Sequence, residues 1–186
     1  MDCTPRMTVP SNVYLVGPMG AGKTTIGRQL AALLHKRFVD ADYEIERRMG
    51  VAIPVIFEIE GEAGFRRRES AVIGALTQEQ DIVLATGGGV VLLEENRQAL
   101  KKNGTVVYLR ADIETLVERT RRDRNRPLLQ TGDPRGKIEQ LLHEREPIYR
   151  QVADVIVDTG TRAPASVARA IAARLKGLST DENAEG

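Results

Sequence analysis

The chain contains no tryptophan, and aromatic residues make up only 4% of its 186 residues. Because 41% of the residues are hydrophobic, aliphatic side chains must fill the core of a folded domain. Cys3 is the only cysteine, which excludes an intrachain disulfide and fits a reducing compartment. The formal net charge is +1, which disfavours a general attraction to nucleic acid or to membranes. Anion binding must therefore come from local clusters of arginine and lysine.

Long apolar segments are lacking as well. The first twelve residues contain no apolar run long enough for a signal peptide, and no stretch approaches the length of a membrane span. We therefore expect a cytoplasmic protein without a membrane partner. Since no repeat or linker divides the chain, we predict one domain over 1–186, with its core over about 12–176 and flexible ends at 1–11 and 177–186.

Strand and helix patterns alternate along the chain. Continuous apolar runs predict buried strands at 13–16, 82–85, 106–109 and 155–157, and Phe38 and Val39 lead into two aspartates. Helical patterns cover roughly 22–35, 43–49, 54–59, 62–77, 92–101, 113–122 and 165–175, and one more helix ends near Gln151. Solid apolar strands between helices are typical of a parallel sheet covered on both faces, so the sequence predicts a three-layer α/β/α fold. Ligands of such sheets bind outside the carboxyl ends of the strands.

Residues 17–24 read Gly-Pro-Met-Gly-Ala-Gly-Lys-Thr and match the P-loop pattern G-x-x-x-x-G-K-[ST] at every fixed position. A predicted strand precedes the motif and a predicted helix follows it. Glycines allow successive N–H groups to face phosphates, and the helix N-terminus adds partial positive charge. Lys23 is expected to reach the β- and γ-phosphates, and Thr24 to offer its hydroxyl to Mg²⁺. The motif predicts nucleotide binding, but it does not specify the reaction.

Two aspartates, Asp40 and Asp42, follow the second predicted strand. If the chain is still extended there, both side chains point to the same face. One carboxylate could then help to hold Mg²⁺, and the other could accept a hydrogen bond, and perhaps a proton, from an attacking hydroxyl. The alternative is that Asp42 simply caps the helix that begins at Tyr43.

Several arginines could bind anions although the net charge is small. Arg66, Arg67 and Arg68 lie on a predicted helix and fan out by about 100° each, so at most two can face one pocket. Glu69 lies one turn after Arg66 and could orient it. Arg145 lies on a later helix, and two guanidinium groups from separate helices could clamp a carboxylate. The alternative for each arginine is a solvated helix face.

The densest group of arginines straddles a helix end and the polar stretch 123–136. We predict a mobile lid over about 121–136 that carries Arg126 over the phosphates, because a long loop in a compact domain is often functional. A nucleic-acid patch and a solvated, flexible segment remain as alternatives. The members of this group are Arg119, Arg121, Arg122, Arg124 and Arg126.

Three consecutive glycines, Gly87, Gly88 and Gly89, follow the strand at 82–85. Without Cβ atoms they would let a ligand touch the backbone at the sheet edge, and the Gly88 N–H is a candidate donor. The alternative is a turn that requires positive φ, and both interpretations can hold together.

The ordered set of these motifs, from about Tyr14 to Arg174, resembles the shikimate kinase family. The shared segments are 17–25, Phe-Val-Asp-Ala-Asp at 38–42, Ile56 and Phe57 with 61–62 and 65–66, 86–89, Arg-Pro-Leu-Leu at 126–129 and Arg-Glu-Pro-Ile-Tyr at 145–149. A P-loop alone is shared by many activities, whereas this set in this order is far more specific. The resemblance implies the fold of nucleoside-monophosphate kinases, with a five-stranded parallel sheet. It also implies ATP-dependent phosphorylation of shikimate at its 3-hydroxyl by a monomer with Mg²⁺.

The resemblance also implies a role for each matching residue. Asp42 would take ring hydroxyls of shikimate and act with Lys23 and Arg126 in catalysis. Shikimate would further contact Arg66, Gly88 and Arg145, with Phe57 and Phe65 on its apolar side and Glu69 supporting Arg66. ATP would lie against Gly20, Ala21, Gly22, Lys23, Thr24, Thr25, Arg119, Arg126 and Pro164. Thr24 and Asp40 would hold the metal.

Ala52 is a small departure from the family, because a helix-capping serine is common at this position and Pro54 follows it. The rival functions are another P-loop small-molecule kinase, such as a gluconate or nucleoside-monophosphate kinase, and a non-catalytic nucleotide switch or nucleic-acid-associated ATPase. The sequence has no N-K-x-D motif for guanine recognition, which argues against a GTPase.

Overall fold

The computed structural model describes residues 10–121, 129 and 132–181. A parallel sheet of five strands forms its centre, in the order β2-β3-β1-β4-β5. The strands are β1 (Val13–Val16), β2 (Arg37–Asp40), β3 (Ile82–Ala85), β4 (Thr105–Arg110) and β5 (Val155–Asp158). The helices are α1 (Lys23–Leu34), α2 (Ala41–Met49), α3 (Ile53–Leu76), the 3₁₀ turn η1 (Val90–Leu92), α4 (Glu94–Asn103), α5 (Ile113–Thr120), α6 (Pro134–Val152) and α7 (Pro164–Asp181). The predicted α/β/α fold is confirmed.

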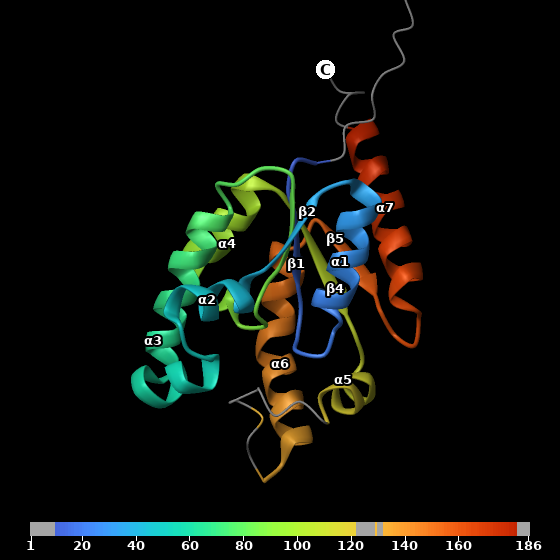
Figure 1. Cartoon of the computed structure of the whole chain (residues 1–186). Coiled ribbons are helices and arrows are strands. Elements are labelled where there is room, and N and C mark those ends of the chain that lie inside the picture. The colour runs from blue at the N-terminus through green and yellow to red at the C-terminus, as the bar shows by residue number, and fades with distance from the viewer. Residues whose placement is uncertain (1–9, 122–128, 130–131, 182–186) are drawn as a thin grey trace, which may run out of the picture.

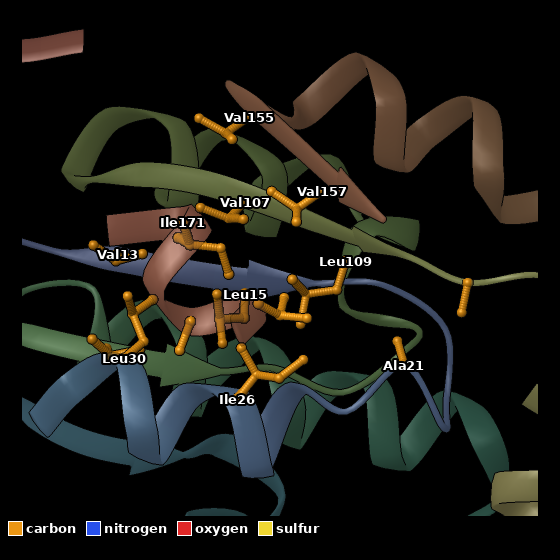
Figure 2. Close-up of a cluster of buried hydrophobic side chains, with 14 of the residues drawn as sticks. Val13, Leu15, Ala21, Ile26, Leu30, Val107, Leu109, Val155, Val157 and Ile171 are labelled. Atoms are coloured by element: carbon orange, nitrogen blue, oxygen red, sulfur yellow. The ribbon is translucent and has the colours of Figure 1, made fainter. Parts of the chain in front are cut away.

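Helices cover both faces of the sheet, with α1 and α7 on one side and α3 and α4 on the other (Figure 1). Successive residues of β1 point to opposite faces, so Val13 and Leu15 join one hydrophobic cluster while Tyr14 and Val16 join another. Figure 2 shows the first cluster, in which Leu30 of α1 and Ile171 of α7 pack against the sheet. Two buried layers, one aliphatic and one that also contains aromatic side chains, thus hold the strand ends in fixed positions.

Some boundaries differ from the predictions. The polar stretch predicted over 123–136 ends earlier, because α6 begins at Pro134, where proline is favoured in the first helical turn. Asp133 caps this helix, its Oδ1 accepting from the Gly136 N–H at 2.9 Å. The C-terminal helix also continues past Leu175 to Asp181, into the segment where we expected a flexible end.

The long helix α3 is interrupted at Gly61, which adopts φ 68° and ψ −176°. This break confirms two helical segments over the predicted ranges 54–59 and 62–77. Ala52 offers no side-chain cap to the first segment. The side chain of Glu46 on α2 caps this segment instead, because its Oε1 accepts a hydrogen bond of 3.0 Å from the Ile53 N–H.

In the described parts of the chain, no helix is long and apolar enough to cross a membrane.

Candidate functional site

The P-loop connects β1 to α1, and its backbone is shaped by glycines. Gly17, Gly20 and Gly22 all have positive φ, a region that other residues rarely adopt. Gly20 also has no room for a side chain, since a Cβ there would lie 2.9 Å from Thr120 Cγ2 of α5. Gly22 is the N-cap of α1 and carries no side chain that could satisfy the first N–H groups of the helix. This end of α1 therefore suits an anionic ligand.

The ammonium group of Lys23 lies over the P-loop. Its Nζ donates hydrogen bonds to the carbonyl oxygens of Gly17 (2.7 Å) and Pro18 (2.8 Å). The side chain is largely buried and lines the pocket beside the loop. A positive charge is thus fixed next to the helix N-terminus, where phosphate oxygens would add to the favourable electrostatics.

Asp40 connects the P-loop helix to α2. Its Oδ2 accepts a hydrogen bond of 2.7 Å from the Thr24 hydroxyl, and its Oδ1 accepts from the N–H groups of Asp42 (3.0 Å) and Tyr43 (3.2 Å). Asp40 is therefore the cap of α2, and our alternative that Asp42 caps this helix was wrong. The chain is also not extended at Asp42, because α2 begins at Ala41. Both carboxylates nevertheless line the same pocket.

That pocket has a volume of 480 Å³ and lies at the carboxyl ends of the strands. P-loop residues and the two aspartates form one wall of it. Its lining also includes Thr86, Thr120, Thr159 and Arg162, to which the sequence analysis gave no role. Thr86 and Thr159 directly follow β3 and β5, so the rule that ligands bind at strand ends could have identified them. No sequence signal marks Thr120, which reaches the pocket through the packing of α5.

Arg119 also lines the pocket, and its guanidinium holds two loops together. Its Nη1 donates to the carbonyl oxygen of Gly20 (3.2 Å) and to Thr159 Oγ1 (3.3 Å), and its Nη2 donates to the carbonyl oxygen of Gly160 (2.7 Å). The guanidinium therefore bridges the P-loop and the loop after β5. Arg119 and Pro164 both line the pocket, and their contact with the nucleotide stays a prediction.

A second group of charged side chains is buried beside the pocket. Arg66, Glu69 and Arg145 are only 9%, 0% and 4% exposed. Arg66 donates to Glu69 Oε2 at 2.8 Å and to Glu62 Oε1 at 3.0 Å. Burial lowers the pKa of Arg66, but Glu69 and Glu62 raise it overall, so the guanidinium stays charged. Burial also raises the pKa of Glu69, against the opposing effect of Arg66.

These buried groups keep unused hydrogen-bonding capacity. Arg66 Nε, Glu69 Oε1 and Arg145 Nε find no partner within the described ranges. Buried polar atoms without partners are costly in a purely structural role. The arrangement therefore suits a polar ligand that supplies the missing partners.

The glycine turn (Gly87, Gly88 and Gly89) brings these side chains together. None of the three glycines has positive φ, so the interpretation as a strained turn was wrong. Space is the reason for the glycines. A Cβ on Gly87 would lie 2.7 Å from Glu69 Oε1 and 3.1 Å from Asp42 Oδ1, and one on Gly89 would lie 2.3 Å from Arg66 Nη1. At Gly88 the nearest side-chain atom is Arg145 Nη1, at 3.7 Å.

The three neighbouring arginines on α3 have different environments, as helical periodicity predicts for consecutive residues. Arg67 is exposed, whereas Arg68 donates to Glu60 Oε1 at 2.6 Å across the break at Gly61. Only Arg66 faces the glycine turn. Phe57 and Phe65 pack with their ring centroids 4.8 Å apart, and Arg66 lies over Phe65 at 5.2 Å.

Two further predictions concern the lid and the metal. Arg126 and most of the predicted lid lie outside the described residues, so their roles stay predictions. The described ranges contain no group of three or more histidine, cysteine or acidic side chains that could hold a metal ion. The oxygen atoms of Thr24 and Asp40 remain suitable for a hard cation that takes its other ligands from phosphate and water.

Comparison with known proteins gives a consistent result. The family model described as shikimate kinase matches residues 19–176. A shikimate kinase of Thiobacillus denitrificans is 59% identical over 91% of this chain and 92% of its own. One of Bordetella pertussis is 57% identical over 88% of this chain and 78% of its own.

Solved structures agree with the sequence comparison. The structure of a shikimate kinase from Acinetobacter baumannii in complex with shikimate superposes with a TM-score of 0.89, at 50% identity over 90% of this chain and 94% of that one. A gluconokinase from Sinorhizobium meliloti shares the fold, with a TM-score of 0.61 at 17% identity. From the P-loop to α7, this chain belongs to the shikimate kinase family.

Proposed function

We propose that this enzyme transfers the γ-phosphoryl group of ATP to the 3-hydroxyl of shikimate, giving shikimate 3-phosphate and ADP. The observation that carries the proposal is the meeting of two buried arginines, Arg66 and Arg145, beside a P-loop pocket that Asp42 lines. The substrate is a polyhydroxylated ring with one carboxylate. Guanidinium groups match that carboxylate, and the aspartate matches the hydroxyls.

ATP would bind with its phosphates on the P-loop, between the N–H groups at the start of α1 and the ammonium group of Lys23. Phosphate oxygens would compete with the Gly17 and Pro18 carbonyls, which lie 2.7 and 2.8 Å from Lys23 Nζ. The adenosine part would extend toward Arg119 and Pro164. We propose this orientation because both residues line the pocket and Arg119 connects the P-loop to the loop after β5.

Thr24 and Asp40 would hold Mg²⁺, Thr24 through its hydroxyl and Asp40 through water. The 2.7 Å hydrogen bond between them supports this proposal, because it brings two oxygen atoms together beside the P-loop. When bound, the ion neutralises negative charge on the phosphates.

Asp42 would position the 3-hydroxyl and accept its proton as the oxygen attacks the γ-phosphorus in line with the departing ADP oxygen. Arg66 and Arg145 would hold the carboxylate, with Glu69 orienting Arg66. The Gly88 N–H would donate to a further substrate oxygen, and Phe57 and Phe65 would contact the apolar side of the ring. Arg126 would approach the phosphates from the lid. Holding both reactants in this geometry supplies most of the rate enhancement.

A coupled assay of ADP release tests the proposal. With MgATP, shikimate should raise ADP release far above the rate without an acceptor, whereas gluconate and nucleoside monophosphates should leave it near that background. A higher rate with gluconate, or equal ADP release with and without any acceptor, would contradict it. The cytoplasmic location and the monomeric state stay predictions from the sequence.

A further inference from the structure

The glycine turn is anchored at each of its carbonyl groups. The Gly87 carbonyl oxygen accepts from the Val90 N–H at 3.2 Å, and that of Gly89 accepts from the Leu92 N–H at 3.0 Å. Both donors are backbone groups of η1. The Gly88 carbonyl oxygen instead accepts from a side chain, the hydroxyl of Tyr149 on α6. One phenol thus completes a set of bonds that the local backbone leaves incomplete.

Three consecutive glycines need such anchoring, because glycine has more conformational freedom to lose than any other residue. Val90 and Leu92 fix the two ends of the turn. The middle carbonyl determines the orientation of the peptide plane between Gly88 and Gly89. Without a donor at that position, the centre of the turn could rotate while both ends stay bound.

Tyr149 is well suited to hold this peptide in one orientation. Its side chain is 0% exposed, so water does not compete for the bond. Burial raises the pKa of the Tyr149 hydroxyl, and the charge of Arg145 together with its hydrogen bond to the hydroxyl opposes this rise only partly, so the group remains a donor at neutral pH. Arg145 precedes Tyr149 by one helical turn on α6, which places both residues on the same face of the helix.

We propose that Tyr149 is a positioning residue for shikimate, fixing the centre of the glycine turn against Arg145 through its bond to the Gly88 carbonyl. This inference rests on the proposed function, in which the Gly88 N–H and Arg145 contact the substrate. Tyr149 itself touches no reacting group. The Gly88 N–H belongs to the preceding peptide, which Val90 anchors through the Gly87 carbonyl, so Tyr149 acts on it through the Gly88 Cα. Tyr149 thereby sets the spacing between two substrate contacts that lie far apart in the sequence.

The chain offers a matched control in Tyr108 of β4. The Tyr108 and Tyr149 rings stack with centroids 5.1 Å apart and an interplanar angle of 25°, and both are 0% exposed. The Tyr108 hydroxyl, however, has no hydrogen-bond partner in the described chain. Changing either tyrosine to phenylalanine removes one buried oxygen from the same stacked pair, but only Tyr149→Phe releases the glycine turn.

The test is to measure steady-state kinetics of wild type, Tyr149→Phe and Tyr108→Phe with each substrate varied in turn. Assays run below the lowest melting temperature keep all three proteins folded. We expect Tyr149→Phe to raise the KM for shikimate about tenfold, the loss of one buried hydrogen bond, with kcat and the KM for ATP within about twofold of wild type. Tyr108→Phe should leave all three parameters near wild type.

Two outcomes would overturn the proposal: a shikimate KM for Tyr149→Phe equal to that of Tyr108→Phe, or equal rises in the KM for shikimate and for ATP. A purely structural role would lower the melting temperature and the active fraction without separating the two KM values. Absence of shikimate-dependent ADP release from the wild type would instead contradict the proposed function, so the two failures are distinguishable.

Discussion

The two halves of the site are built by different means. On the proposed nucleotide side, glycines with positive φ shape the P-loop within eight consecutive residues, 17–24. On the proposed shikimate side, half-buried Asp42 of α2 and buried side chains of α3 and α6 converge on a turn whose glycines have ordinary φ. The glycines of the first half are required by backbone conformation as well as by space, whereas those of the second half are required by space alone.

This difference determines which amino-acid substitutions each half of the site tolerates. A P-loop glycine is required because its own φ is positive, so a substitution there strains the loop whatever surrounds it. At Gly89 the side chain of Arg66, a residue 23 positions earlier in the sequence, instead leaves no room for a Cβ atom. Substitutions on the shikimate side should therefore affect shikimate selectively, and those on the nucleotide side should affect ATP.

The largest effect should follow from Asp42→Asn, because this residue lies between the halves. The amide keeps the shape but cannot accept the proton, so kcat should fall by about 10²–10⁴ while ATP binding stays nearly normal. Turnover and ATP affinity, measured separately, test this. Asp81→Asn is the control, since Asp81 is exposed, pairs with Lys36 at 3.0 Å and has a positive φ that asparagine also tolerates. Full turnover by Asp42→Asn would refute its role as base.

Arg145→Lys should weaken the binding of shikimate without weakening the binding of ATP. Lysine keeps the charge but loses the planar fork, so the KM for shikimate should rise about 10- to 100-fold with the KM for ATP unchanged. Arg150→Lys provides the control on the same helix, because among the described residues Arg150 donates only to Glu146, at the surface. An unchanged shikimate KM in Arg145→Lys would show that Arg145 does not clamp the shikimate carboxylate.

Gly89→Ala tests whether space determines the glycine turn. The new methyl group would overlap Arg66, whose guanidinium would have to leave its bonds to Glu69 and Glu62. We expect a folded protein with a shikimate KM raised by roughly tenfold. Gly74→Ala on the same helix as Arg66 has nothing within 4 Å of the added Cβ and should behave as wild type. If Gly89→Ala also behaves as wild type, the contact with Arg66 does not matter.

The same contrast decides what the sequence could predict. The P-loop is a local pattern, and the alternation of apolar runs with helices gave the parallel sheet. Helical periodicity limits how many of Arg66, Arg67 and Arg68 can face one pocket, but it does not say which of them does. Only the family resemblance singled out Arg66. The structure identifies it by burial.

Contacts between distant residues escaped the sequence analysis. The bond from Tyr149 to Gly88 joins residues 61 positions apart, and Thr120 reaches the P-loop only because α5 packs on it. The start of α2 was missed for a local reason, because either aspartate could have been the cap. No pattern within the sequence distinguishes Asp40 from Asp42 until the strand end is known.

Arg119→Lys should give the opposite selectivity to Arg145→Lys. Lysine cannot bridge the carbonyl oxygens of Gly20 and Gly160 with a planar fork, so the loop after β5 should detach from the P-loop. We expect the KM for ATP to rise about fivefold while the KM for shikimate stays at the wild-type value. Arg110→Lys, which alters an exposed pair with Asp158, is the control. Equal changes in both KM values would mean that the two halves are not independent.

The smallest effect should come from Glu46→Ala, which changes stability without changing either half of the site. Glu46 caps the first N–H of α3 because Ala52 cannot, so its loss should lower the free energy of unfolding by about 1 kcal/mol. Denaturant unfolding measures this, and both KM values should remain within about twofold of wild type. Adding Ala52→Ser to Glu46→Ala should recover part of the loss, because a serine hydroxyl at the N-cap can share the Val55 N–H, which already donates to the carbonyl oxygen of residue 52 at 3.0 Å. Failure of that rescue, with the destabilisation confirmed, would show that Glu46 acts through packing between α2 and α3 rather than as a cap.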